Sequence, residues 1–290
     1  MITINSIKEM VRTREQITNN QQSVGFVATM GFLHDGHLKL IKEARKENDV
    51  VIVSIFVNPL QFNQSTDLET YPRDFKRDEQ LLIGEQVDYL FYPNVEEMYP
   101  EPLSIVMTVN ERTNVLCGKS RPGHFDGVVT VLTKLFNIIQ PTNTYFGLKD
   151  AQQVAVVDAL IDDFNFNIEL KPVPTVREED GLAMSSRNIH LNDEERLEAK
   201  HIYQSLLVGK EYIRTNKNWQ RVDVIRKITD YLLHHVTGDI DYVDCLNFPK
   251  LNYEISENHD IIIAVAVQYK KARLIDNIIL NDKGQFKYGE

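Results

Sequence analysis

The stretch Val24-Gly-Phe-Val-Ala-Thr-Met-Gly-Phe-Leu-His-Asp-Gly-His37 decides the fold class of this chain. Residues 24–30 form an apolar run that predicts a buried strand, and two glycines then turn the chain. The segment 37–48 follows, with apolar residues at spacings of three and four, as in an amphipathic helix. A buried strand, a turn and a helix in this order are typical of α/β proteins.

The same alternation continues through the first 175 residues. Apolar, β-branched runs predict strands at 24–30, 50–57, 87–92, 105–109, 144–147 and 168–173. Helical spacing predicts helices at 37–48, 73–86, 127–140 and 150–164, the last with an apolar stripe of Val154, Val157, Leu160 and Ile161. Because most of these strands are apolar on both faces, as in a parallel sheet, we expect a Rossmann-like, doubly wound α/β domain over residues 1–175.

A break follows at Pro172 and Pro174, where two prolines remove backbone donors and favour extended geometry. The remaining residues, 176–290, differ in pattern. They predict two amphipathic helices, at 192–214 and 220–235, and two strands, at 242–246 and 261–268. This order indicates a smaller α+β domain.

Composition excludes several classes of protein. The chain has 290 residues, of which 42% are hydrophobic and 26% charged, as in ordinary globular proteins. Its formal net charge of −10 argues against a surface for nucleic acids or anionic membranes, since both require clustered Lys and Arg. A small anion in a local basic pocket remains compatible with that charge.

Cysteine content and apolar segments bear on the compartment. Cys117 and Cys245 are too few for a disulfide framework or a thiol-only zinc site, so we expect two reduced thiols. Residues 1–16 mix charged with apolar residues and lack the apolar core of a secretory signal. The most apolar stretches, 50–57 and 261–267, are shorter than the roughly 20 residues that span a bilayer. We therefore expect a cytoplasmic protein without a membrane segment.

His34 and His37 lie three residues apart where the first strand turns into a helix. A helix N-terminus attracts anions, and ligands of doubly wound sheets bind at the carboxyl ends of the strands. A histidine pair can also be a metal site or two surface residues. The glycine turn and the strand-to-helix context favour phosphate binding.

Two further stretches carry groups suited to phosphates. Ser185, Ser186 and Arg187 offer two hydroxyls and a bidentate guanidinium, although a helix cap beside a surface arginine would have the same sequence. Lys149 and Asp150 follow a predicted strand and a glycine. Lysine could meet a phosphate there and aspartate a ribose, but both residue types are common at helix starts.

Polar groups follow strands in two more places. Asn58 and Gln61 could hydrogen-bond hydroxyl or carboxylate groups, or belong to an ordinary Asn-Pro turn. The segment 121–127 joins Arg121 to His124 in a glycine-bearing loop. A purely structural loop would require neither the guanidinium nor the imidazole.

These segments, in this order, resemble the pantoate–β-alanine ligase family over nearly the whole chain. The histidine turn is similar to the H-x-G-H signature of nucleotidylyltransferases, and residues 184–187 resemble the K-M-S-K-S loop of related synthetases. Four runs are more specific to the ligases: Asn58-Pro-Leu-Gln-Phe62, Arg121-Pro-Gly-His-Phe-Asp-Gly127, Gly147-Leu-Lys-Asp-Ala-Gln-Gln153 and Arg273-Leu-Ile-Asp-Asn277.

The resemblance implies that ATP adenylates the pantoate carboxylate with loss of pyrophosphate, and that the amine of β-alanine then displaces AMP. Four catalytic residues follow from it: His34, His37, Lys149 and Arg187. The histidines would donate to phosphate oxygens in the transition state. Because the imidazoles must be suitably protonated to donate, activity should fall as pH rises past their pKa values.

The remaining roles implied by the resemblance concern binding. ATP would contact the catalytic four and Met30, Gly31, Gly36, Gly147, Asp150, Val176, Met184, Ser185 and Ser186. Pantoate and β-alanine would contact Asn58, Gln61, Tyr71, Arg121, His124 and Gln153. Mg²⁺ would bind the ATP phosphates, with Asp78 as a contributor. Family members are commonly homodimers, and the second domain would close over the nucleotide as a lid.

The sequence departs from the family pattern at two positions and leaves two other functions open. His190 stands where tyrosine is usual, and Ala272 where threonine is frequent, both outside the implied site. Another nucleotidylyltransferase or synthetase-like enzyme with a different carboxylate acceptor would share the histidine turn and the serine loop. A non-catalytic nucleotide-binding protein would not need so many charge-matched groups around the phosphates.

Overall fold

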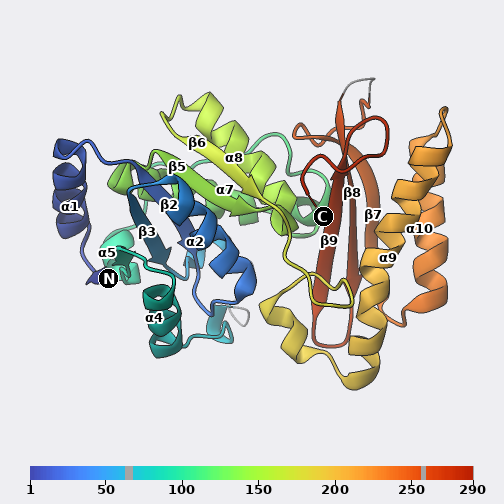
Figure 1. Ribbon diagram of the computed structural model, residues 1–290, viewed down its shortest axis with the longest axis horizontal. Coiled ribbons are helices and arrows are strands. Elements are labelled where there is room, and N and C mark those ends of the chain that lie inside the picture. Colours follow the sequence, from blue (N-terminus) through green and yellow to red (C-terminus); the bar gives the residue numbers. More distant parts are fainter. Residues whose placement is uncertain (63–67, 256–258, 290) are drawn as a thin grey trace. The chain divides into compact units, whose positions relative to one another are not determined.

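The structure is a computed structural model that describes residues 1–62, 68–255 and 259–289. The chain divides into two compact units (Figure 1). Unit 1 consists of Met1–Gly147 and Val156–Val173, and unit 2 consists of Leu148–Ala155 and Pro174–Glu290. The assignment of residues 1–175 and 176–290 to two domains stays a prediction.

A parallel sheet forms the centre of unit 1. Within the described residues it has six strands in the order β1-β4-β3-β2-β5-β6, and every pair is parallel. The strands are β1 (Ile2–Ile4), β2 (Val24–Thr29), β3 (Val50–Ile55), β4 (Tyr89–Phe91), β5 (Asn143–Gly147) and β6 (Glu169–Val173). The expected Rossmann-like, doubly wound α/β fold is confirmed.

Helices connect these strands and pack on both faces of the sheet (Figure 1). The chain runs from β2 through β3 to β4 in one direction and from β5 to β6 in the other, so the strand order reverses between β2 and β5. The helices of this part of the chain are α1 (Ile7–Asn19), α2 (Asp35–Glu47), α4 (Phe75–Gly84), α5 (Val95–Met98), α6 (Leu116–Ser120), α7 (His124–Ile139) and α8 (Ala151–Asp163), with 3₁₀ turns η1 (Pro59–Gln61) and η2 (Leu148–Asp150).

Burial explains which strand predictions succeeded. All six residues of β3 are buried, and so is the predicted stripe of α8. The predicted strand at 105–109 is wrong: Ile105 and Val106 are each 80% exposed and belong to no strand. A β-branched run favours extended backbone, but a strand also needs a neighbour to pair with. Strand β1 was not predicted, because three residues are too few to show a period.

Unit 2 contains an antiparallel sheet in the order β7-β8-β9 and two long helices. Its predicted α+β character is confirmed, although β9 was not predicted as a strand. Leu206 of one helix and Ile228 of the other are buried in one core with Ile263 of the central strand. The elements are η3 (Ser186–His190), α9 (Asp193–Thr215), α10 (Arg221–His235), β7 (Asp239–Phe248), β8 (Asp260–Gln268) and β9 (Arg273–Leu280).

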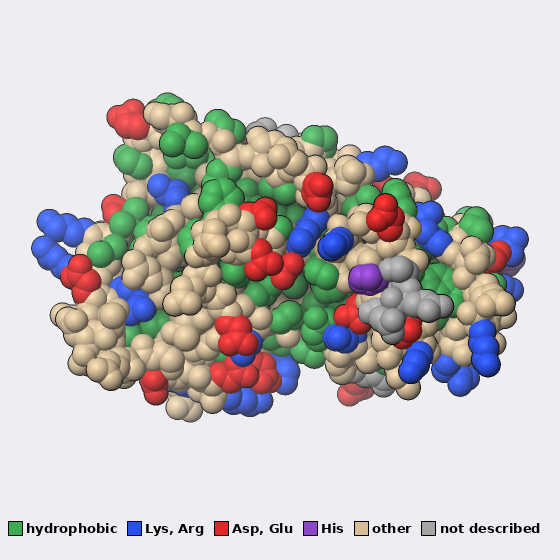
Figure 2. Space-filling view, turned by 90° about the horizontal axis from the view of Figure 1, so that it is seen from above, with side chains coloured by type: hydrophobic (Ala, Val, Ile, Leu, Met, Phe, Trp, Pro, Cys, Tyr) green, Lys and Arg blue, Asp and Glu red, His purple; other side chains and the backbone are tan. Residues whose placement is uncertain are grey.

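Both cysteines are free thiols, as expected. Among the described residues, the structure contains no helix with both the length and the apolar character that crossing a membrane requires. Figure 2 shows Lys and Arg side chains interspersed with Asp and Glu over the face in view.

Gly127 lets α7 approach η1 closely within unit 1. A Cβ at this position would lie 2.3 Å from the carbonyl oxygen of Leu60 and 2.6 Å from the amide nitrogen of Gln61. Both contacts are with backbone, so a larger residue would push the two elements apart.

We therefore expect Gly127→Ala to lower the free energy of unfolding by about 3 kcal/mol, the upper end of the overpacking range. Urea unfolding would measure the loss. Gly84→Ala is the matched control, because a Cβ at this helical position meets nothing within 4 Å. It should be neutral or stabilise by up to about 1 kcal/mol. Equal midpoints for the two variants would contradict the close contact.

Candidate active site

The turn after β2 is held by one buried carboxylate. Gly31 and Phe32 both have left-handed backbone, with φ of 83° and 51°, which is strained for phenylalanine. Asp78 of α4 is 1% exposed and accepts hydrogen bonds from the amides of Phe32, at 2.7 Å, and Leu33, at 2.8 Å. The side chain of Asp78 thus fixes the backbone that leads into α2.

His34 and His37 together cap the N-terminus of α2. The Nδ1 atom of His34 accepts a hydrogen bond from the amide of Gly36 at 3.1 Å. The Nδ1 atom of His37 accepts one from the amide of His34 at 3.3 Å. The two ring centroids lie 4.1 Å apart. The structure therefore brings both predicted histidines to the carboxyl end of β2.

These contacts set the tautomer of both rings. An Nδ1 atom that accepts an N–H carries no proton, so a neutral imidazole in this position carries its proton on Nε2. Such a ring donates from Nε2 without a positive charge. The expected loss of activity with rising pH stays a prediction.

Gly36 makes room for the ring of His34. A Cβ at this position would lie 2.8 Å from Cε1 and 2.9 Å from Nδ1 of that imidazole. The glycine between the two histidines therefore has a steric reason, independent of any ligand.

The predicted amide group gathers around η1 in unit 1. Gln61 donates from Nε2 to the sulfur of Met30 at 3.0 Å and accepts at Oε1 from Asn58 at 3.2 Å. Its carbonyl accepts from Nδ1 of His124 at 2.8 Å. Because a carbonyl only accepts, a neutral His124 carries its proton on Nδ1, opposite to the other two histidines.

Asn58 is committed to protein contacts. It is 1% exposed, and its Nδ2 donates to the carbonyl of Gly127 at 3.0 Å as well as to Gln61. Its Oδ1 accepts from the Tyr99 hydroxyl at 3.0 Å and from the amide of Leu60. Burial raises the pKa of Tyr99, so this hydroxyl keeps the proton that it donates. These contacts make Asn58 a support for Gln61.

Tyr71 and Arg121 lie beside this group through local contacts. The Tyr71 ring packs edge-on against Phe62, the residue after Gln61, with centroids 5.8 Å apart. The carbonyl of Arg121 accepts from the amide of His124 at the start of α7.

Unit 2 brings together Lys149 and Ser185, which line one small cavity with Asn188 and Asp276. The Nζ atom of Lys149 lies 3.8 Å from the carboxylate of Asp150. Ser185 also caps η3, since its Oγ accepts from the amide of Arg187 at 3.2 Å. The predicted alternative of a serine cap is therefore part of the structure.

The rest of the predicted phosphate loop folds back on itself. The amide of Met184 donates to the carbonyl of Val176 at 2.9 Å, and Arg177 forms a β-bridge with Ala183. Ser186 begins η3, and the exposed Arg187 follows it. The predicted site residues thus form two groups: one in unit 1, and a second in unit 2 composed of Lys149, Asp150, Gln153, Val176, Met184, Ser185, Ser186 and Arg187.

Comparison with known proteins identifies the family of this chain. The profile of a family described as pantoate-beta-alanine ligase matches residues 2–279. A pantothenate synthetase of Geobacillus sp. (strain WCH70) is 53% identical over 281 residues, which cover 97% of this chain and 99% of that protein. The chain belongs to the pantoate–β-alanine ligase family.

Two solved structures agree with this assignment. A pantothenate synthetase from Thermus thermophilus has a TM-score of 0.86 and 41% identity, covering 96% of this chain and 99% of that one. A pantoate–β-alanine ligase from Francisella tularensis, complexed with β-γ ATP and β-alanine, has a TM-score of 0.77 and 38% identity, covering 96% and 97%.

A metal site built by this ligase does not emerge from the described residues, in which no three His, Cys, Asp or Glu side chains are grouped to hold an ion. Both oxygens of Asp78, the predicted magnesium contributor, accept backbone amides. Its contacts show a structural role, and its part in magnesium binding stays a prediction.

Three contributors to the two groups were given no role from the sequence, although Asp276 and Asn277 lie in the ligase-specific run 273–277. Nothing around Tyr99 distinguishes it in the sequence. Asp276 and Asn277 did carry a signal, since they are adjacent polar residues in an apolar run. Buried polar side chains need hydrogen-bonding partners, so that pair predicts contacts to another segment.

The tautomers of the three site histidines can be measured. In protein labelled with ¹⁵N-histidine, at about pH 8.5 where unperturbed histidine is neutral, long-range ¹H–¹⁵N spectra should show Nε2–H for His34 and His37 and Nδ1–H for His124. Gly36→Ala should displace the His34 ring and change its signals, while those of His124 stay. An Nδ1–H form of His37 would contradict the capping geometry.

Proposed function

We propose that this protein condenses pantoate with β-alanine at the expense of ATP, through a pantoyl adenylate. In the first step a pantoate carboxylate oxygen bonds to the α-phosphorus, and the bond from that phosphorus to the bridging oxygen breaks, releasing pyrophosphate. In the second step the β-alanine amine bonds to the pantoyl carbonyl carbon, AMP leaves, and the amine loses a proton. The capping pair His34 and His37 carries this proposal.

The two histidines suit the first step. Charge develops on the phosphate oxygens as the carboxylate attacks, and preorganised N–H donors stabilise such charge, often by about 3 kcal/mol per donor. Their Nδ1 atoms are held by backbone amides, so the proton of each neutral ring is on Nε2. The positive end of the α2 dipole, which begins at Asp35, acts in the same direction.

We assign the triphosphate and the leaving pyrophosphate to the unit 2 group. Lys149 and Ser185 lie together there beside a cavity of about 10 Å³, which is too small to enclose a phosphate, so the phosphates would bind outside it. Ser186 and Arg187 follow Ser185 directly. Ammonium and guanidinium groups compensate the phosphate charge, and the guanidinium binds in bidentate fashion. The rest of the nucleotide would contact Met30, Gly31, Gly36, Gly147, Asp150, Val176 and Met184.

The acceptor region, where pantoate and β-alanine would bind, is assigned to the polar side chains around η1. Gln61 and Gln153 would orient pantoate, and Tyr71, Arg121 and His124 would complete the region for β-alanine. Asn58 would act through Gln61, to which it donates. This group favours the ligase over a nucleotidylyltransferase with another acceptor, because amides recognise hydroxyl and carboxylate groups.

Magnesium enters this proposal only with the phosphates of ATP. Asp78 uses both oxygens on the turn after β2, so its contacts do not fit a protein-built magnesium site. The family resemblance supports a homodimeric, cytoplasmic enzyme as a further part of the proposal.

An isotope experiment tests the intermediate. Pantoate with oxygen-18 in its carboxylate is incubated with the protein, ATP, Mg²⁺ and β-alanine. We expect pantothenate, pyrophosphate and AMP in equal amounts, with one labelled oxygen in AMP, because the carboxylate oxygen stays on phosphorus when the amine displaces it. Mass spectrometry measures the label. Release of ADP with labelled inorganic phosphate would show an acyl phosphate and refute the adenylate.

Substitution of Gln61 tests the acceptor assignment. Gln61→Ala should raise the KM for pantoate by about tenfold, which corresponds to the loss of one hydrogen bond to a substrate. The KM for ATP should change by less than about twofold. Initial rates with each substrate varied in turn give both constants. Equal effects on the two would remove Gln61 from the acceptor region.

A further inference from the structure

Strand β9 carries two adjacent polar residues in an otherwise apolar stretch. Asp276 is 2% exposed and Asn277 is 7% exposed. Both pair in register with β8, Asp276 with Val265 and Asn277 with Ala264. Burying a carboxylate and an amide is costly unless each finds hydrogen-bonding partners, so their contacts show what they support.

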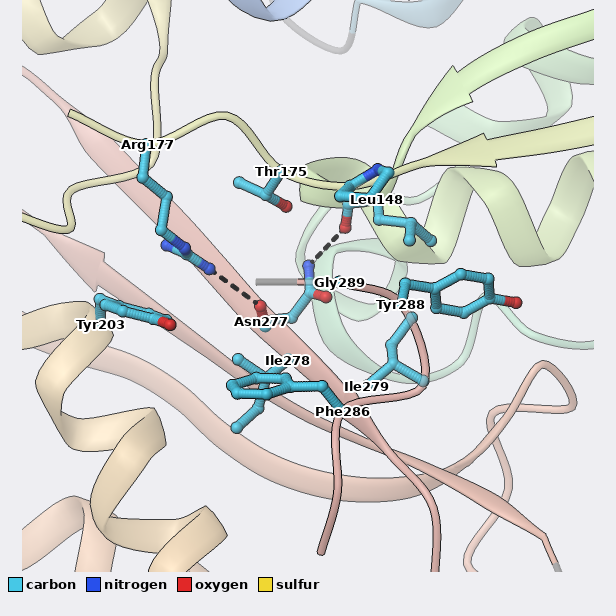
Figure 3. A pocket seen from close by; sticks show the side chains of 11 residues that line it. Leu148, Thr175, Arg177, Tyr203, Asn277, Ile278, Ile279, Phe286, Tyr288 and Gly289 are labelled. Carbon is cyan, nitrogen blue, oxygen red and sulfur yellow. Dashed lines mark hydrogen bonds between the residues drawn. The ribbon is translucent and has the colours of Figure 1, made fainter. Parts of the chain in front are cut away.

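Asn277 holds the backbone on both sides of the Lys149 Cα atom. Its Nδ2 donates to the carbonyl of Leu148 at 2.9 Å and to the carbonyl of Lys149 at 2.9 Å. One amide nitrogen has two hydrogens, so it can serve both acceptors. Figure 3 shows the contact with Leu148. The peptide groups that flank Lys149 are thereby tied to β9.

Asp276 ties the neighbouring loop to the same strand. Its two oxygens accept from Arg177 at 2.6 and 3.1 Å, a bidentate pair. Arg177 also donates to the carbonyl of Gly181 at 3.1 Å, and its guanidinium lies 3.7 Å from the ring centroid of Tyr203. The loop that leads to Ser185 is thus anchored one residue away from the anchor of Lys149.

The cavity beside these anchors is too small for a substrate. It is lined by Arg177, Tyr203 and Asn277, among others, and its volume of about 30 Å³ holds a few water molecules at most (Figure 3). Arg177 also donates to the carbonyl of Asn277 at 3.4 Å. This region is therefore suited to holding backbone in place.

We propose that Asn277 is a positioning residue for Lys149. Together with Asp276 it sets the Lys149 ammonium in register with the loop that presents Ser185, Ser186 and Arg187 to the phosphates. The inference rests on the proposed function, in which Lys149 compensates charge during adenylation. Asn277 is buried and its Nδ2 donates to backbone carbonyls, so in this proposal its effect on the rate passes through Lys149.

Asn277→Ala removes both donors. Because a small misplacement of a catalytic group can cost up to about 100-fold, we expect kcat for pyrophosphate formation to fall by about 10- to 100-fold. The KM for ATP should change by less than about threefold. Asn277→Ser keeps one donor for two carbonyls and should lose less. It also carries the test if the alanine variant does not fold.

The matched control is Asn247→Ala. Asn247 lies on β7 of the same sheet, is 4% exposed and donates to the carbonyl of Glu254 at 3.2 Å. Both alanine variants lose a buried amide and should lower Tm, Asn277→Ala more because it loses two hydrogen bonds where Asn247→Ala loses one. Only the Asn277 variant should lose adenylation rate.

A double-mutant cycle with Lys149→Met separates positioning from general damage. If Asn277 acts through Lys149, Asn277→Ala should slow the Lys149→Met enzyme by less than about twofold, although it slows the wild type far more. Full additivity of the two substitutions in their effect on the rate would overturn the inference. So would an Asn277→Ala variant that forms pyrophosphate as fast as the Asn247→Ala control. Absence of pyrophosphate formation by the wild type would instead refute the proposed function.

Discussion

The contact between the Asp78 carboxylate and the amides of Phe32 and Leu33 is the one on which the histidine site depends. The two amides belong to a left-handed turn that no sheet or helix supports, and the carboxylate is buried where an unpaired charge would be costly. Each partner satisfies the other. Because α2 begins a few residues later, the direction of the turn also fixes where His34 and His37 cap the helix.

The same arrangement occurs at three places in this ligase. Asp78 holds the turn after β2, Asn58 holds Gln61 and the start of α7, and Asn277 holds the backbone around Lys149. In each case a buried polar side chain of one element binds the backbone or side chain of another. Reactive groups at strand ends lie beyond the ladder of the sheet, so they need such support to keep a fixed position.

The sequence alone was sufficient to predict a strand or a site residue where one physical signal dominates. Strands such as β3 were predictable because they are apolar on both faces, and His34 and His37 because a glycine turn links a strand to a helix. The segment 105–109 shows the limit, since its β-branched residues indicate extended backbone and nothing indicates a partner strand. Asn58 shows the same limit, because an amide that could hydrogen-bond a substrate could equally hydrogen-bond another part of the protein. Only the burial and the contacts of Asn58 show which protein groups it binds.

The three site histidines show what the backbone adds to residue identity. In sequence they are equivalent imidazoles. Backbone amides donate to Nδ1 of His34 and His37, whereas a carbonyl accepts from Nδ1 of His124. As neutral rings the first two therefore present a donor at Nε2, and the third presents an acceptor there. Donors match phosphate oxygens, and an acceptor matches an ammonium group better than a carboxylate. Proton placement thus distinguishes three imidazoles that the sequence alone does not.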